Sequence, residues 1–171
     1  MRKKYLLVDG YNIINAWRDV FDPNDDLEMN RDKLTDMLVD FGGNKDFIVI
    51  VVFDAQQVKG GKGSMLEKDG IFIVFTEENE TADNYIEKFV YEKGSVDRIF
   101  VATSDYMEQR LVITNGGARI TPKELKELLE DNKKAQRRII NSLKDTPNTF
   151  LDFLTPEQKK WMERLRRKGH G

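Results

Sequence analysis

A run of seven consecutive apolar residues, 47–53, constrains the fold of this 171-residue chain more than any other feature. The run is rich in β-branched and aromatic residues, a composition typical of a strand. A strand without alternating polar residues is buried on both faces, as in the centre of a parallel sheet. The chain is therefore predicted to be an α/β protein with helices on both faces of its sheet.

Further apolar runs and helical patterns alternate along the chain. Strands are predicted over residues 5–8, 71–75, 98–103 and 118–120, and helices over residues 29–41, 81–93, 105–113 and 121–143. Residues 55–70 contain little apolar sequence and several glycines, so a mobile loop is predicted there. Right-handed crossovers between successive strands then give a three-layer α/β/α fold with a mostly parallel central sheet.

The predicted organisation is one domain followed by an appendage. Residues 1–144 form the domain, and residues 145–171 form a linker with a short basic helix around Trp161. No run of eighteen apolar residues occurs, so neither a membrane span nor a signal peptide is predicted, and a cytoplasmic location is expected.

The chain has no cysteine, and its one histidine is the penultimate residue, His170. Disulfides, thiolate nucleophiles and cysteine-type zinc sites are excluded, and histidine-based catalysis is not expected. Any catalytic chemistry must therefore depend on carboxylates.

Four aspartates follow the predicted strands: Asp9, Asp54, Asp83 and Asp105. Aspartate is common in turns and helix caps, so each residue taken alone has a structural explanation. Together, however, they would meet at the carboxyl edge of the sheet, where parallel α/β folds bind ligands. Clustered carboxylates repel unless a cation neutralises them, and oxygen ligands select Mg²⁺ or Mn²⁺. Such an ion can support phosphodiester hydrolysis.

Several motifs resemble the YacP-type NYN ribonucleases of bacteria, a PIN-like family. The resemblance rests on Asp9-Gly-Tyr-Asn-Ile-Ile14, Val52-Phe-Asp-Ala55, Lys59-Gly60, Asn79-Glu-Thr-Ala-Asp83, Ala102-Thr-Ser-Asp105, Gly117-Ala-Arg119 and Thr121-Pro-Lys-Glu-Leu125. It extends to about residue 140. It implies a PIN-like fold, Mg²⁺ or Mn²⁺ dependence, and endonucleolytic cleavage of single-stranded RNA. It also implies association with the ribosome and cleavage of mRNA there.

The resemblance also implies roles for individual residues. Asp9 and Asp83 would be the principal metal ligands, and Asp105 and Asp54 would complete the cluster directly or through water. Asn12 would orient Asp9 or a substrate phosphate. Lys59, Lys62 and Ser104 would contact RNA. Asn84 stands beside Asp83 in place of a second carboxylate, which leaves open whether one ion or two bind.

Charge is distributed unevenly along the chain. From Lys133 onward there are eleven Lys or Arg and four Asp or Glu, against seventeen and twenty-six before it. The basic residues Lys133, Lys134, Arg137 and Arg138 are predicted to contact RNA phosphates. Alternatively, their aliphatic stems cover apolar surface. Of the aromatic residues near Asn12, Trp17 is predicted to pack in the core, and Tyr11 could stack on a base.

Three other readings compete with a nuclease. A haloacid-type phosphatase would need Asp-x-Asp where this chain has Asp9-Gly-Tyr. The glycines 60–63 lack the spacing of a phosphate-binding loop, so no nucleotide cofactor is expected. The third reading is a non-catalytic ribosome or RNA adaptor with a structural metal site, although an adaptor would not need the whole acidic set.

Overall fold

The computed structural model describes residues 1–42, 46–55, 62–145 and 155–168. The chain consists of two compact units, Met1–Asp131 and Asn132–Gly171. The first unit contains the entire sheet. The domain boundary predicted at residue 144 stays a prediction.

The first unit is built on one six-stranded sheet with the order β3-β4-β2-β1-β5-β6. The strands are β1 (Lys4–Asp9), β2 (Ile48–Phe53), β3 (Lys62–Lys68), β4 (Ile71–Glu77), β5 (Arg98–Ala102) and β6 (Ala118–Ile120). Every neighbouring pair is parallel except β3 and β4. β1 and β2 lie in the middle and are buried along almost their whole length, which confirms the central parallel strand predicted for residues 47–53.

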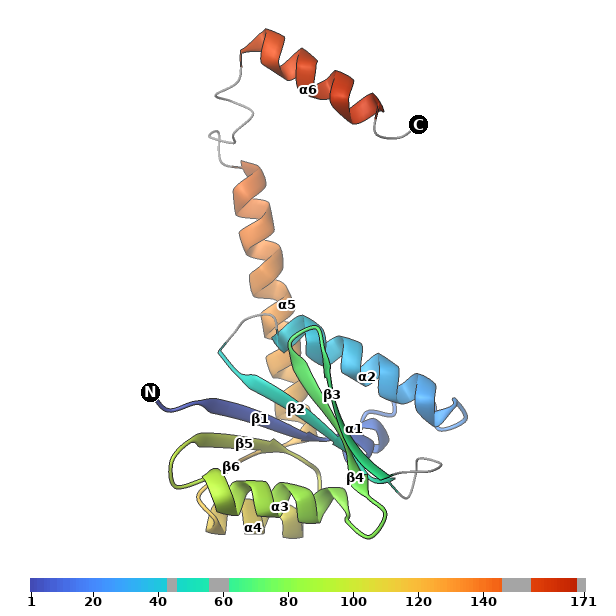
Figure 1. The fold of residues 1–171 in the computed structure, drawn as a ribbon, viewed down its shortest axis with the longest axis vertical. Helices are drawn as coiled ribbons and strands as arrows, with labels where there is room; N and C mark the ends of the chain where they lie inside the picture. Colours follow the sequence, from blue (N-terminus) through green and yellow to red (C-terminus); the bar gives the residue numbers. More distant parts are fainter. Residues whose placement is uncertain (43–45, 56–61, 146–154, 169–171) are drawn as a thin grey trace. The chain divides into compact units, whose positions relative to one another are not determined.

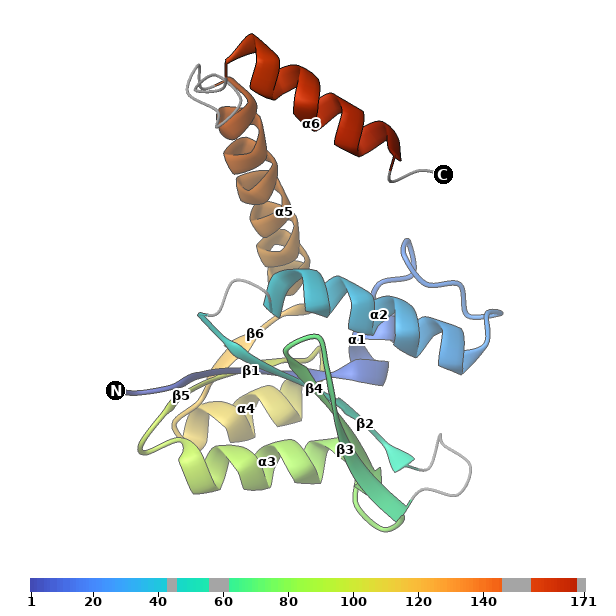
Figure 2. The same cartoon turned by 45° about the horizontal axis from the view of Figure 1, so that its top comes forward.

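Helices cover both faces of this sheet (Figure 1, Figure 2). They are α1 (Gly10–Ala16), α2 (Leu27–Gly42), α3 (Ala82–Lys93), α4 (Tyr106–Thr114) and the first part of α5 (Pro122–Asp145). One core layer joins the sheet to α1, α2 and Leu125 and Leu129 of α5, and the other joins it to α3 and α4. The predicted α/β/α fold with a mostly parallel sheet is therefore confirmed.

The second unit contains the remainder of α5 and α6 (Pro156–Lys168). Its side chains at Lys133, Lys134, Arg137 and Arg138 are exposed. In the part of the chain that the structure describes, no helix is both long enough and apolar enough to cross a membrane.

Two short elements were not predicted. Part of the predicted loop over residues 55–70 is wrong, because β3 pairs there with β4. The turn between them places Asp69 at φ 48° and Gly70 at φ 88°, the backbone of a tight two-residue hairpin. α1 begins at Gly10, directly after β1, where only a turn was predicted.

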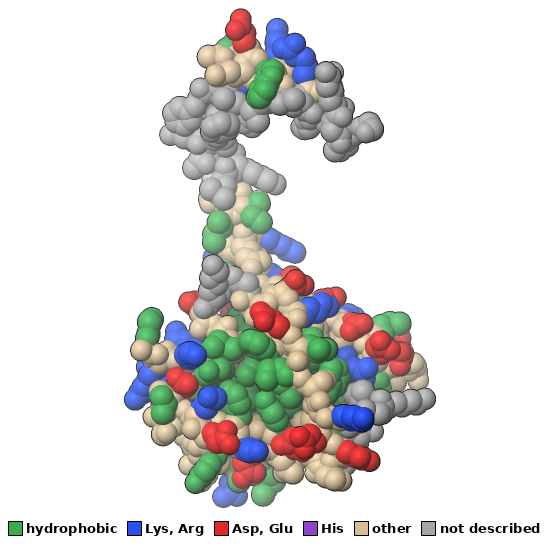
Figure 3. Space-filling view, viewed as in Figure 1, with side chains coloured by type: hydrophobic (Ala, Val, Ile, Leu, Met, Phe, Trp, Pro, Cys, Tyr) green, Lys and Arg blue, Asp and Glu red, His purple; other side chains and the backbone are tan. Residues whose placement is uncertain are grey.

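β3 is an edge strand that is exposed along most of its length. Hydrophobic side chains gather in the middle of the face shown in Figure 3. Among the exposed hydrophobic residues are Met65 and Leu66 of β3. Charged residues at the ends of the strand, Lys62 and Lys68, are of the kind that discourages edge-to-edge pairing.

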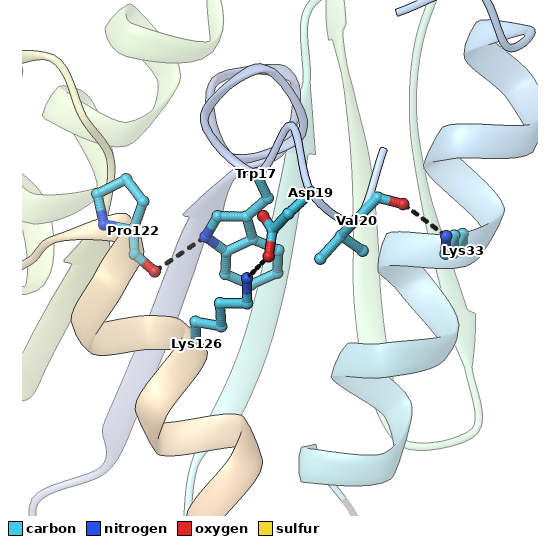
Figure 4. Close-up of polar contacts among 6 residues, drawn as sticks. All are labelled: Trp17, Asp19, Val20, Lys33, Pro122 and Lys126. Carbon is cyan, nitrogen blue, oxygen red and sulfur yellow. Dashed lines mark hydrogen bonds and ion pairs between the residues drawn. The ribbon is translucent and has the colours of Figure 1, made fainter. Parts of the chain in front are cut away.

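The segment that follows α1 is fixed at three points (Figure 4). The indole Nε1 of Trp17 donates to the carbonyl oxygen of Pro122 at 3.0 Å. Lys126 forms an ion pair with Asp19, and Lys33 Nζ donates to the carbonyl oxygen of Val20 at 2.6 Å. Trp17 is only 3% exposed, so its predicted place in the core is confirmed.

Gly10 allows α1 to start against the sheet. A Cβ atom there would lie 2.2 Å from Cε1 of Phe53, far inside van der Waals contact. We expect Gly10→Ala to lower the free energy of unfolding by about 1–3 kcal/mol, because the ring of Phe53 is fully buried and must shift. Urea denaturation measures this change.

A double-mutant cycle with Phe53→Leu identifies the cause. A smaller side chain at residue 53 makes room for the methyl group, so the two losses should be less than additive. Additive losses would show that contact with Phe53 is not the cause.

Candidate metal centre

Three carboxylates from separate elements meet at the carboxyl edge of the sheet. Asp9 ends β1, Asp83 lies in the first turn of α3, and Glu108 lies in the first turn of α4. One oxygen from each lies within 4.8 Å of the others. Asp9 and Glu108 are buried, with 7% and 4% exposure, whereas Asp83 is exposed.

The local sequence explains why these residues meet. Side chains alternate across a strand, so Asp9 follows Leu7 toward the face that α3 and α4 cover. Asp83 and Glu108 each lie at a helix N-terminus, where the helix dipole favours negative charge. Three acidic residues can therefore be held in place by elements that fold for other reasons.

The side chain of Asp9 is fixed by a contact with α1, the helix that it caps. Its Oδ1 accepts a long hydrogen bond of 3.5 Å from the backbone N–H of Asn12 and so caps α1. Burial, followed by the neighbouring Asp83 carboxylate, raises the pKa of Asp9 to about 7. The ionised form that a metal ion requires is therefore costly without a cation.

Glu108 carries the clearest sign of a missing partner. Both carboxylate oxygens are buried, and neither has a hydrogen-bond partner among the described residues. Burial raises the pKa of Glu108 to about 9; the Thr103 hydroxyl opposes this rise, and the carboxylates of Asp9 and Asp83 add to it. A buried acid without partners is rare in folded proteins.

A divalent cation would satisfy all three groups. The donor set contains only carboxylate oxygens, the ligands that Mg²⁺ and Mn²⁺ prefer. Because Asp83 is exposed, one side of the cluster faces solvent. The residues present therefore fit a divalent metal ion.

Asn12 and Ser104 connect two strand ends beside this cluster. Asn12 Oδ1 accepts hydrogen bonds from the backbone N–H and the hydroxyl of Ser104, at 2.6 and 2.7 Å. Because a backbone N–H can only donate, the orientation of the Asn12 amide is fixed, with its oxygen toward Ser104. These bonds hold the start of α1 against the loop that follows β5.

The other predicted site residues lie elsewhere or play structural roles. Asp105 caps α4, its Oδ1 accepting from the backbone N–H of Met107 at 2.9 Å. Asp54 follows β2, and neither it nor Asp105 belongs to the close group found among the described residues. Lys62 is exposed at the start of β3, and Lys59 lies outside the described residues.

Glu108 was missed by sequence reasoning. A signal was present, because Glu108 stands three residues after the cap Asp105, at the first turn of the next helix. Glutamate at that position is ordinarily explained by capping and by the helix dipole. Its burial depends on how α4 packs, which a single sequence does not show.

The fold and the acidic centre define a nuclease-type α/β domain. The sequence model of the YacP-like NYN domain family matches residues 6–167, and the chain belongs to this family.

Individual YacP proteins are similar to this chain over nearly its whole length. Uncharacterized protein YacP of Bacillus subtilis (strain 168) is 37% identical over 169 residues, covering 95% of this chain and 96% of the relative. The crystal structure of Rae1 (YacP) from the same species matches with a TM-score of 0.68 at 36% identity, covering 95% of this chain and 94% of the other. A tryptophan-to-leucine mutant of that protein matches with a TM-score of 0.69 at 33% identity, covering 86% and 87%.

Stability should depend on pH in the metal-free protein. The folded-state pKa values of Asp9 and Glu108 are raised, so both groups stabilise the fold while protonated and lose that contribution as they ionise. We expect the Tm in EDTA to fall as pH rises from about 4.5 toward about 9. For a domain of this size, each kcal/mol lost lowers the Tm by about 2–4 °C.

Glu108→Gln tests the origin of this dependence. The variant should show a flatter pH profile in EDTA and a smaller gain in Tm from added Mn²⁺ than the parent protein. Glu92→Gln, an exposed change on α3, serves as the control and should leave both properties unchanged. A parent Tm that is constant across this range would contradict the prediction.

Proposed function

We propose that this protein is a metal-dependent endoribonuclease that cleaves single-stranded RNA. The observation that carries the proposal is the buried Glu108 carboxylate, with no hydrogen-bond partner among the described residues, grouped with Asp9 and Asp83. Mg²⁺ or Mn²⁺ bound to these residues would supply Lewis-acid activation of water and of the phosphodiester. Membership of the YacP-like NYN family supports the same class of activity.

Individual residues would bind the metal ion and position the substrate phosphate. Asp9, Asp83 and Glu108 provide the ligand charge, and Asp83 provides it on the solvent-facing side. Asn12 presents its side-chain N–H₂ group to a substrate phosphate oxygen, because Ser104 holds its amide oxygen. Asp105 adds negative charge close by while it caps α4.

The proposed substrate is mRNA on the ribosome. The four exposed basic residues of α5 lie in a chain segment with a large excess of Lys and Arg, whereas the rest of the chain is acidic. An acidic nuclease needs such a basic surface to approach a polyanion. Lys133, Lys134, Arg137 and Arg138 are therefore proposed to contact RNA phosphates, and Lys59 and Lys62 are proposed to contact the RNA backbone as well.

Asp83→Asn should reduce cleavage by at least about a hundredfold and leave binding nearly unchanged, because it removes a ligand charge and little volume. Cleavage is measured with Mn²⁺ on single-stranded RNA and on translating ribosomes, and binding by co-sedimentation with ribosomes. Asp105→Asn is the matched control: asparagine also caps helices, so stability should stay within about 0.5 kcal/mol and cleavage should fall less. Full activity of Asp83→Asn would refute the assignment of Asp83 as a metal ligand. Ribosome binding without cleavage by the parent protein would favour the adaptor alternative.

Replacing Lys133, Lys134, Arg137 and Arg138 together by Gln should weaken ribosome binding by about tenfold or more. The slope of log affinity against log salt should become shallower by about 0.7–0.9 for each phosphate that the variant no longer neutralises. Replacing Lys3, Lys4, Lys88 and Lys93 by Gln is a control of equal charge change. Equal effects of the two sets would show that only net charge matters.

A further inference from the structure

A small pocket lies between the end of α1, the segment after it and the start of α2. It has a volume of about 170 Å³ and is lined by Ile14, Asn15, Arg18, Phe21, Asp22, Pro23, Leu27 and Asn30. This is smaller than the usual pocket for a drug-sized ligand, but it suits one flat ring system. None of these residues takes part in the acidic centre.

The chemistry of the pocket suits a nucleobase. Ile14 and Phe21 are buried and supply an apolar floor. Around it stand an amide at Asn15, a guanidinium at Arg18 and a carboxylate at Asp22. Proteins recognise unstacked RNA bases with this combination, an apolar or guanidinium surface for the ring and polar groups for its edge.

Several polar contacts fix the walls of the pocket. The segment that carries Phe21 and Asp22 is held by the contacts of Trp17, Asp19 and Val20 shown in Figure 4. In addition, Asn30 Nδ2 donates to the carbonyl oxygen of Asp22 at 3.3 Å. Binding of a ligand would therefore cost little ordering entropy.

α1 links the acidic centre to the pocket, because Asp9 caps its start and Ile14 and Asn15, near its end, line the pocket. Asp9 caps this helix, whose seven residues span about 10 Å, a distance that an RNA strand covers within a few nucleotides. Arg31 of α2 contacts the start of α1, because its guanidinium donates to the Tyr11 hydroxyl at 2.9 Å, and it also lies over the ring of Phe75. Among the described residues Arg31 has no ion-pair partner, so its charge is available for a phosphate.

We infer that this pocket binds one unpaired nucleobase of the RNA substrate a few nucleotides from the scissile bond, while Arg31 contacts the intervening phosphate. The inference rests on the proposed nuclease function and adds a source of sequence preference to it. Asn15, Arg18 and Asp22 read the edge of the base, and Tyr11 positions Arg31.

Binding is tested directly with the four nucleoside 5′-monophosphates in metal-free buffer. At least one should shift the side-chain amide resonances of Asn15 and Asn30 in ¹⁵N-correlated spectra in a saturable manner. Ribose 5-phosphate, which lacks the base, should not. Arg18→Ala should weaken binding by about tenfold, whereas Arg98→Ala, an exposed change at the start of β5, should not.

Absence of shifts with all four nucleotides would overturn the inference. Equal shifts with ribose 5-phosphate, or unchanged affinity in both Arg18→Ala and Asn15→Ala, would also overturn it.

Cleavage separates this inference from the proposed function. In RNAs varied at each position near the cut, the parent protein should prefer particular bases at one position. In Asn15→Ala and Arg18→Ala, the ratio of kcat/KM for RNAs with the preferred base to kcat/KM for RNAs with another base there should fall toward one. If these variants cleave RNA with the same base preference as the parent, base binding in the pocket is refuted, whereas the proposed nuclease function stands. Nucleotide binding without any cleavage on ribosomes overturns the nuclease but keeps the pocket as a nucleobase site.

Discussion

Repulsion among Asp9, Asp83 and Glu108 is the constraint on which the site depends. Two of the three carboxylates are buried, and burial together with mutual repulsion favours their protonated forms. Such a group can persist only where the surrounding fold is rigid enough to hold it. The central strand β1 and the first turns of α3 and α4 provide that rigidity, since each is fixed by the hydrophobic layers on the sheet. The strain stored by the acids is then available to a cation as binding free energy.

The sheet could be predicted from the sequence because its strongest signal is local. A continuous apolar run such as residues 47–53 has one stable location, the middle of a covered sheet. The antiparallel edge was harder, because β3 is exposed and shows no alternation of polar and apolar residues. Asp69-Gly70 is a usable hairpin signal, but the polar composition around it favours a loop. α1 was missed because a seven-residue helix has too few turns to show a period.

The site was predicted less completely than the fold, for a physical reason. Asp9 and Asp83 could be placed near each other because the carboxyl ends of parallel strands share one edge. Proximity to that edge does not give the direction of a side chain, and Asp105 uses its carboxylate to cap α4. Glu108, one turn further along the same helix, points inward. Which acid points inward depends on the packing of α4, and this information lies in tertiary contacts.

The acidic centre and the pocket between α1 and α2 belong to different faces of the sheet. Asp9 faces the layer of α3 and α4, whereas Tyr11, two residues later, packs against Phe53 in the layer of α1 and α2. The β1–α1 junction therefore serves both sides, and Gly10 allows the close approach that this sharp change of direction requires. The pocket and the acidic group share no residue, so under the proposed function a substitution in the pocket would alter base preference without replacing a metal ligand. A fold arranged in this way could change its sequence preference while its acidic centre stays the same.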